Sequence, residues 1–431
     1  MKNKETATFC IEALKKAGAD KSQCVLSKSK KYELNAEAGE ISLLRTTFNT
    51  NIRLMAIKDK RRGYGSLNGE DETAIEEAAK NAVKFSEASP QDEAYDISEI
   101  QPAETFDNGM VEPDLDRIYN RLNNFLMEAK KRYPKVNMRT STIDFTRTDS
   151  YLLNSNGIDF LSSQGIYEVV AMFSSQDGKK TSSFNYSVFS SKNLEKEIIN
   201  SSSFDTLLKQ SSQQTETKAL EGKFTGEIII TPDCLGDFMG FISDAAIRDG
   251  SLIAGTSIYK DKLNKTIASD KFTLHSKPVS PEIADGYFIT PDGYKAENLT
   301  IIDKGVLKTF ILSLYGAKKT GLNRVSNSGS CYMVDPGEKS FADIVKSIKK
   351  GLLVARFSGG RPNDNGDFSG IAKNSYYIED GKIQYPVSET MIAGNIPQMF
   401  LSIKDISKER VDFGSSILPW ISFGGITVSG K

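Results

Sequence analysis

The sequence contains one histidine, His275, among its 431 residues. Zinc hydrolases usually bind their metal through three protein ligands, commonly including two histidines on one helical face. A single histidine cannot complete such a set. A serine or cysteine nucleophile would have to use His275, which stands among strand-like residues before Pro278, and the GxSxG motif is absent from the sequence. We therefore interpret His275 as an exposed or half-buried residue near a strand end.

Cysteine is also scarce. The four cysteines are widely spaced and form no CxxC pair: Cys10, Cys24, Cys234 and Cys331. This spacing fits neither a zinc ribbon nor a disulfide framework. We expect reduced, partly buried thiols in a cytoplasmic protein.

Excess charge and long apolar runs are missing as well. Lys and Arg total 55 against 56 Asp and Glu, so the net charge is -1. This balance supplies no field that would draw the chain onto nucleic acid or an anionic membrane. No run of about 18 apolar residues occurs, so we expect no transmembrane helix. The polar residues Glu12, Lys15 and Lys16 interrupt the N-terminal apolar pattern, so we expect no secretory signal.

The glycine-rich and acidic stretches do not match cofactor motifs. The glycine pairs at 359–360 and 424–425 lie in neither a GxxxxGK[ST] nor a GxGxxG pattern and indicate turns or bulges. The acidic stretch 364–367 is similar to the start of a calcium loop, but the twelfth position is Ser375 instead of glutamate. We expect no cofactor and no bound metal.

The length of the chain favours two domains. In the first half, apolar spacing predicts helices before Gly18, over 70–88 and over 114–132, with Phe85 and Leu115 on the buried stripes. Strands are predicted over 23–35 and 40–57, and we interpret Gly63 and Gly65 as a turn that ends this run.

From 140 to about 189 the apolar period becomes two, which is typical of strands. Asn156-Gly157 and Asp177-Gly178 occupy hairpin positions in this region. The Ser-, Gln- and Thr-rich stretch 201–218 follows, and we place the domain boundary there, giving domains 1–215 and 216–431.

The second half opens with a strand at 227–230 and a helix at about 233–248, which begins after a Thr-Pro-Asp start signal. We expect Phe238, Phe241 and Ala245 on the buried side of that helix. Repeated Asp-Gly turn signals between β-like runs indicate an antiparallel sheet, interrupted by a helix at about 340–350. The predicted class is α+β, with N-terminal helices packed on a sheet and a mainly antiparallel C-terminal β domain.

Ordered stretches across the chain resemble the TldD/PmbA family, whose members are also described as modulators of DNA gyrase. The most specific block is 366–395, with GDFSG at 366–370, YIEDGKI at 377–383, YPV at 385–387 and IAGN at 392–395. The segments 63–66, 255–257, 267–269 and 426–430 are similar too. The resemblance covers essentially the whole chain.

The resemblance implies a divided family. A TldD-like zinc peptidase carries HExxxH on the helix after the strand that is similar to 227–230, and a late cysteine adds a ligand. A PmbA-like, or TldE-like, subunit lacks this motif. Aligned on Gly236, the two histidine positions and the glutamate position fall on Gly240, Ala245 and Phe241, and no cysteine follows Cys331. These residues cannot bind zinc, so the resemblance is to the PmbA-like branch, with no catalytic or metal-binding residue.

Three functions follow as hypotheses. The first is a non-catalytic subunit that assembles with a TldD-like zinc peptidase and helps to enclose its peptide channel. The second is an autonomous peptidase-like enzyme with different chemistry, and the third is a gyrase modulator that does not bind DNA directly. For the first, we expect a homodimer in isolation and a pairing surface within 366–431, where Trp420 is either an interface residue or part of the core.

Overall fold

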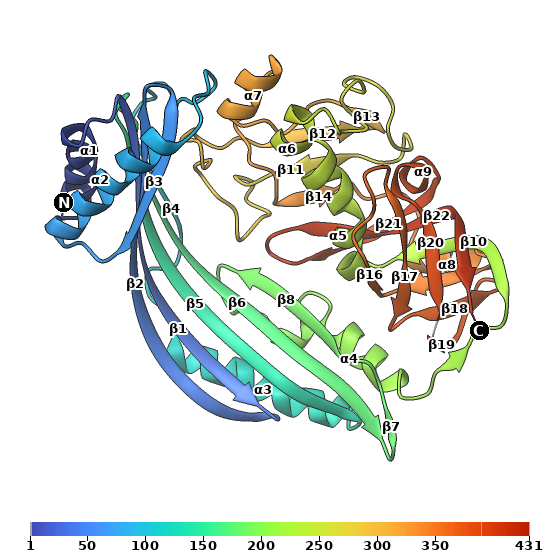
Figure 1. Cartoon of the computed structure of the whole chain (residues 1–431). Helices are drawn as coiled ribbons and strands as arrows, with labels where there is room; N and C mark the ends of the chain where they lie inside the picture. The colour runs from blue at the N-terminus through green and yellow to red at the C-terminus, as the bar shows by residue number, and fades with distance from the viewer. Residues whose placement is uncertain (1, 389, 431) are drawn as a thin grey trace.

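The computed structural model describes residues 2–388 and 390–430, and it has an α+β fold of two domains (Figure 1). The strands of the first sheet all lie between residues 21 and 191, and those of the second lie between 218 and 429. The boundary at 215/216 stays a prediction. The N-terminal elements are α1 (Lys2–Lys16), β1 (Lys21–Glu37), β2 (Glu40–Lys58), β3 (Arg61–Asn68), α2 (Glu72–Ala88), β4 (Glu104–Gly109), α3 (Leu115–Arg132), β5 (Val136–Asn154), β6 (Asp159–Asp177), β7 (Lys180–Thr181), β8 (Asn185–Ser191), a 3-10 turn (Ile198–Asn200) and α4 (Phe204–Gln213).

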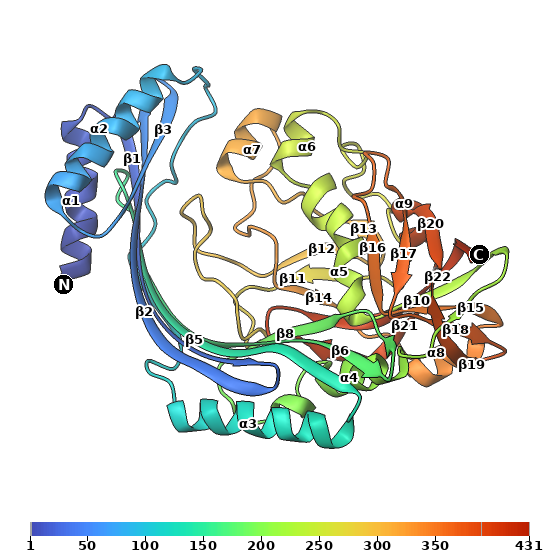
Figure 2. The same ribbon diagram turned by 60° about the horizontal axis from the view of Figure 1, so that its bottom comes forward.

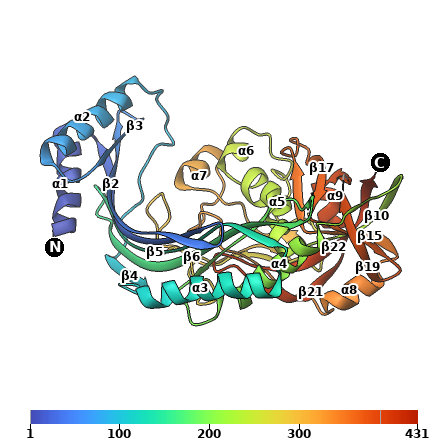
Figure 3. The same ribbon diagram turned by 90° about the horizontal axis from the view of Figure 1, so that it is seen from below.

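The N-terminal sheet is built on four long antiparallel strands in the order β2-β1-β5-β6. Figure 2 shows this sheet bending around the C-terminal domain, with α1 and α2 outside one arm and α3 outside the other. Figure 3 shows α3 running along the outer face. The convex face packs on these helices through apolar residues such as Leu26, Leu54 and Phe145. The concave face of the sheet is turned toward the C-terminal domain.

The turns of the hairpins match their sequence signals. Gly157 and Gly178 both have positive φ, 101° and 58°, at the ends of the β5–β6 and β6–β7 pairs. Glycine adopts this backbone conformation without the steric cost that a Cβ imposes. Both predicted hairpins are therefore confirmed.

The interpretation of Gly63 and Gly65 as a strand-ending turn was wrong. The turn lies earlier, at Asp59 and Lys60, which have φ of 49° and 58°. Both glycines lie inside β3 and pair with β2. A Cβ on Gly63 would stand 2.0 Å from the carbonyl oxygen of Ala82 in α2. The glycines are there because α2 crosses the strand in close contact.

Helices α2 and α3 form where the apolar spacing predicts them. Asp71 and Asp114 accept hydrogen bonds from backbone N–H groups of the first turns and so cap the two helices. Two predicted stripe residues are exposed, Phe85 by 57% and Leu115 by 42%. Leu115 is the first residue of α3, and Phe85 lies on the flank of α2, since its neighbour Ser86 is the residue buried against β3.

The C-terminal sheet has fourteen strands and is mainly antiparallel, as predicted. In the described chain the parallel strand pairs of this sheet join residues 227–230 to 351–354, Met333 to Ile417, and 218–219 to 387–388. Its elements are β9 (Lys218–Ala219), β10 (Lys223–Ile230), α5 (Pro232–Gly240), a π-helical segment (Phe241–Ala246), α6 (Asp249–Ile253), β11 (Leu274–Ser276), β12 (Leu299–Asp303), β13 (Val306–Leu307), α7 (Leu314–Thr320), β14 (Tyr332–Val334), α8 (Phe341–Ser347), β15 (Lys350–Val354), β16 (Arg356–Gly359), β17 (Asp367–Lys373), β18 (Tyr376–Glu379), β19 (Lys382–Ser388), β20 (Met391–Asn395), α9 (Ile396–Leu401), β21 (Ile403–Asp412) and β22 (Ile417–Ser429).

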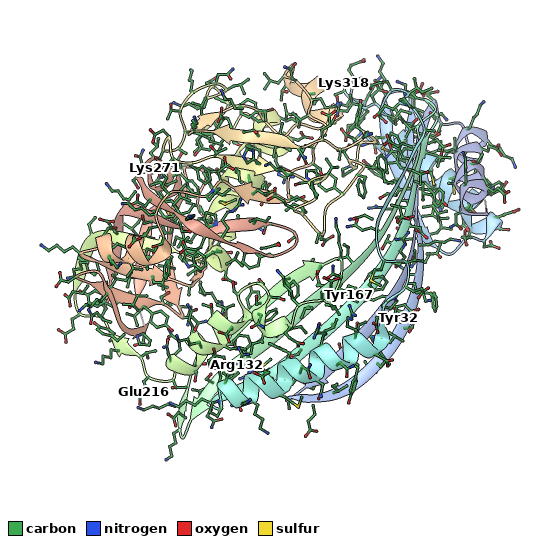
Figure 4. The ribbon with its side chains drawn as sticks, turned by 180° about the vertical axis from the view of Figure 1, so that it is seen from behind. Tyr32, Arg132, Tyr167, Glu216, Lys271 and Lys318 are labelled. Carbon is green, nitrogen blue, oxygen red and sulfur yellow. The ribbon has the colours of Figure 1, made fainter. Side chains whose placement is uncertain are left out.

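Polar contacts join the two domains. Tyr294 donates a 2.6 Å hydrogen bond to Glu99, and Gln164 of β6 donates a 3.3 Å hydrogen bond to Asp285. Lys318 of α7 (Figure 4) makes a further contact between the domains, where its ammonium group pairs with Asp96. In the described chain no helix combines the length and apolar character needed to cross a bilayer.

Candidate functional site between the two domains

A cavity of about 950 Å³ lies between the concave face of the N-terminal sheet and the C-terminal domain. Alternate residues of the long strands form one wall, including Val25, Ser150 and Gln164. The opposite wall includes Asp244 and Arg248, which follow α5, and the loop 287–292. A cavity between domains is a common place for a ligand site.

The predicted helix 233–248 is divided. It runs as α5 to Gly240, continues as the π-helical segment and ends before α6 begins at Asp249. Phe238 and Phe241 are buried as expected, but Ala245 is exposed, so placing Ala245 on the buried side was wrong. The prediction for Ala245 assumed α-helical spacing along the whole helix. The π segment changes that spacing from residue 241 onward.

The exposed side of this helix is acidic. Asp233, Asp237 and Asp244 are all exposed, as are Gly236 and Ala245, while Gly240 is half-buried. Gly240 and Ala245 thus have access to solvent on the helix surface, whereas Phe241 lies in the apolar core of the C-terminal domain.

The helix end is held by Arg248. Its guanidinium group donates to the backbone oxygens of Ser243 at 3.0 Å and Ser328 at 2.7 Å, to Asp244 at 2.9 Å and to the Tyr332 hydroxyl at 3.2 Å. Charged hydrogen bonds are the stronger kind. These hydrogen bonds therefore hold the end of the π segment in one orientation at the wall of the cavity.

The other residues that could take part in chemistry, the histidine and the cysteines, do not form a common site. His275 is half-buried in β11, with ring nitrogens 2.9 Å from Thr300 Oγ1 and 3.1 Å from Asp335 Oδ1, as expected for a strand-end histidine. The four cysteines are free and buried. Across residues 2–388 and 390–430, no three His, Cys, Asp or Glu side chains form a group that could hold a metal ion.

An acidic row on the concave face escaped the sequence analysis. Glu33, Asp144 and Glu168 are direct cross-strand partners on β1, β5 and β6. Burial raises the pKa of Asp144. Partial burial, followed by repulsion from Asp144 and Asp285, raises the pKa of Glu168. Burial opposes the shift at Glu33, but hydrogen bonds from Arg45, Asn35 and Lys31 hold its pKa low.

The variant Glu168→Gln should show how this row depends on pH. Because folding raises the pKa of Glu168, its ionised form disfavours the folded state above that pKa. The variant should therefore unfold at a higher temperature than the wild type at about pH 7. Its advantage should shrink as the pH falls through the raised pKa, because the wild-type carboxyl group then takes up a proton. Thermal unfolding of both proteins between about pH 7 and 4.5 tests this, and a difference independent of pH would contradict it.

Comparison with known proteins connects this geometry to a family. The model of the PmbA/TldA metallopeptidase C-terminal domain matches residues 222–430, and that of PmbA/TldA metallopeptidase domain 1 matches residues 24–86. The metalloprotease PmbA homologue of Haemophilus influenzae is 23% identical, with 98% of this chain and 96% of that protein aligned. Metalloprotease PmbA of Escherichia coli O157:H7 is 31% identical over 42% of each chain.

Solved structures show the same fold. TldE from Thermococcus kodakarensis superposes with a TM-score of 0.86 at 19% identity, covering 99% of this chain and 100% of that one. A candidate modulator of DNA gyrase from Bacteroides thetaiotaomicron gives a TM-score of 0.88 at 23% identity, covering 100% of this chain and 99% of that one. With both family domains matched in order and the fold shared along the full length, this chain belongs to the PmbA/TldD family.

Proposed function

We propose that this chain is a non-catalytic, PmbA-like subunit that assembles with a TldD-like zinc peptidase and helps to enclose its peptide channel. The observation that carries the proposal is the chemistry of three positions. Where the resemblance places histidine, glutamate and histidine, this chain has Gly240, Phe241 and Ala245. None of these side chains can bind zinc or transfer a proton.

The π-helical segment supports this assignment. Two histidines five residues apart in an α-helix would point about 140° away from each other, because each turn holds 3.6 residues. A π-helix links residues i and i+5 and so brings such a pair onto one face, and π segments are frequent at functional sites. The segment Phe241–Ala246 therefore has the geometry that the spacing from Gly240 to Ala245 would require of a ligand pair.

The surface of the C-terminal block supports assembly. Ile371, Ile383, Met391 and Leu401 are between 36% and 47% exposed, on β17, β19, β20 and the end of α9. Ile371 and Met391 are cross-strand partners, and adjoining exposed apolar side chains are typical of surfaces that another chain covers. Trp420 contributes less, because it is half-buried and its ring lies 5.3 Å from that of Phe341.

Mixing this chain with a TldD-like protein from the same cell should give a stable complex. We expect an interface burying more than about 1,000 Å², the usual minimum for a specific contact. Alone, the chain should form a symmetric homodimer, since the absent partner would be a relative of this chain. Analytical ultracentrifugation at micromolar concentration measures both. A strictly monomeric species in both samples would contradict the subunit proposal.

The purified chain should carry no tightly bound zinc. Metal analysis after dialysis should find less than about 0.1 zinc per chain, because the sequence cannot supply the usual ligand set. The names of the relatives favour a competing function, an autonomous metallopeptidase. About one zinc per chain, together with peptide hydrolysis by the isolated chain, would support that function.

A further inference from the structure

The N-terminal sheet ends in an open edge at β3. Among the described residues β3 pairs with β2 alone, so its other edge has no strand beside it. The two-residue turn 59–60 has positive φ at both positions, so Lys58 and Arg61 form the hydrogen-bonded pair that closes the hairpin. From there, hydrogen-bonded and non-hydrogen-bonded pairs alternate along the antiparallel ladder. The backbone N–H and C=O groups of Tyr64 and Ser66 therefore point to the open edge.

The backbone contacts agree with this alternation. Gly69, which belongs to the odd-numbered set, donates a 3.0 Å hydrogen bond to the carbonyl oxygen of Thr50 across the ladder. No other segment of the described chain forms a backbone hydrogen bond with Tyr64 or Ser66. Their N–H and C=O groups are thus available to an additional strand.

A groove of about 680 Å³ lies beside this edge, and we call it the β3–α2 groove. Residues 64–67 of β3 form one side of it. The other side is a stripe of α2 at helical spacing, made up of Ala74, Ala78, Asn81 and Phe85. An exposed strand edge can bind an extended peptide, which adds a strand to the sheet through main-chain hydrogen bonds. The helix supplies a wall for the side chains of such a peptide.

Arg53 brings an uncompensated positive charge to the groove. It is exposed and lies directly opposite Ser66 in the register of β2 and β3. In the part of the chain that the structure describes, its guanidinium group makes neither an ion pair nor a hydrogen bond. Arg53 and Tyr64 line both the groove and the cavity between the domains. The two spaces therefore adjoin at these residues.

The carboxylates of the adjoining cavity already have partners within the chain. They are held by Lys318, by Arg248 or by backbone N–H groups at the start of α7, in the cases of Asp96, Asp244, Asp249 and Asp292. A carboxylate from outside the chain would therefore be the partner that Arg53 lacks.

The two faces of the groove differ in chemistry. Helix α2 packs on the face of β3 that carries Gly65, whereas Tyr64 and Arg53 belong to the opposite face. Successive side chains of an added strand point to opposite faces as well. On the α2 side, Phe85 is 57% exposed and offers apolar contact, while Glu77 would repel a carboxylate. An apolar side chain therefore suits the α2 side, and an acidic one suits the Arg53 side.

We propose that the β3–α2 groove binds an extended peptide of alternating apolar and acidic residues as an additional strand on β3, with a carboxylate on Arg53. This inference rests on the proposed function, because it extends the peptide channel from the cavity to the outer surface. A peptide fits better than a folded partner, since a strand in the groove can continue past Arg53 and Tyr64 into the cavity.

The first experiment uses the full chain and a fluorescein-labelled octapeptide of alternating valine and glutamate. In the companion peptide, glutamine replaces every glutamate. Fluorescence polarisation should show that the wild type binds the glutamate peptide about tenfold more tightly than the companion. Equal affinity for the two peptides would overturn the inference.

The variant Arg53→Gln should bind both peptides about equally. Arg53 is exposed, so the variant should fold, and circular dichroism checks this. Lys80→Gln is the matched control, because Lys80 is exposed on α2 but does not line the groove. It should keep the tenfold preference. Equal effects of the two variants would assign the preference to general charge attraction and overturn the role of Arg53.

A second pair of peptides tests strand addition with the wild-type protein. One is N-methylated at the glutamate amides and the other at the valine amides, so each lacks the donors of one edge. Only one edge of an added strand faces β3. One methylated peptide should therefore lose more than about tenfold in affinity and the other less than about threefold. Equal losses would overturn strand addition.

Sedimentation with a TldD-like partner separates this inference from the subunit proposal. Arg53→Gln should assemble as the wild type does. A chain that assembles but does not distinguish the peptides overturns only the inference about the groove. A chain that distinguishes them but never assembles overturns the subunit proposal and leaves the groove as a peptide site. Release of the peptide by the partner, or by self-association of the chain, would make the groove a subunit contact and overturn the inference.

Discussion

Replacing Phe241 by glutamate is expected to lower the free energy of unfolding by about 3 kcal/mol. Phe241 lies in the core of the C-terminal domain, and a Cβ on Gly366 would be 3.2 Å from its ring. The substitution removes a large apolar side chain from this core and places a carboxyl group among apolar neighbours. Chemical denaturation monitored by circular dichroism gives the change directly.

Two controls separate this effect from general sensitivity of the segment. Phe241→Leu keeps the side chain apolar and should cost less than about 1.5 kcal/mol. Ala245→His introduces a larger polar side chain in the same segment, but Ala245 is exposed, so its effect should stay within about 0.5 kcal/mol. A loss at Ala245→His as large as at Phe241→Glu would contradict the burial pattern of the π segment.

Gly63→Ala is expected to destabilise the N-terminal domain by at least about 3 kcal/mol, at the upper end for overpacking. The added Cβ would stand 2.0 Å from the carbonyl oxygen of Ala82 and 2.3 Å from the nitrogen of Ser86. These atoms belong to the backbone of α2 and cannot rotate away. The helix would have to separate from β3, exposing the apolar residues that it covers. Equilibrium denaturation measures the loss.

The same substitution at Gly236 is the control. This glycine lies on the exposed side of α5, and no atom stands within 4 Å of its added Cβ. Replacing a helical glycine by alanine usually stabilises by about 0.5 to 1 kcal/mol. If Gly63→Ala and Gly236→Ala had similar effects, close contact between α2 and β3 would not be the reason for glycine at position 63.

Local patterns in the sequence predict most elements of the fold. Helix α3 follows from the spacing of Ile118, Leu122 and Phe125, and all three residues are buried. The hairpin between β5 and β6 follows from Asn156-Gly157. In both places the residues that fix the structure are neighbours in the chain, so period and turn chemistry are sufficient.

Contacts between distant segments were not predictable in this way. The sequence around Gly63 is typical of a turn, and only the folded structure shows that α2 packs against it. Glu33, Asp144 and Glu168 are far apart in the sequence, and only the strand register brings them into one row. The exposure of Ala245 depends on the π-helical segment, which a search for 3.6-residue periodicity does not detect. Alternation of polar residues in β1, β5 and β6 was the available signal for the row.

The π-helical segment also determines how this chain would respond to losing one residue. A π turn holds one residue more than an α turn, so a single deletion there would let the helix continue in regular α form. The last residues of the segment would then rotate by about 100°. Arg248, which follows in extended backbone, would be displaced from its partners Ser328 and Tyr332. The hydrogen bonds from Arg248 to Ser328 and Tyr332 thus stabilise the π turn from within the chain.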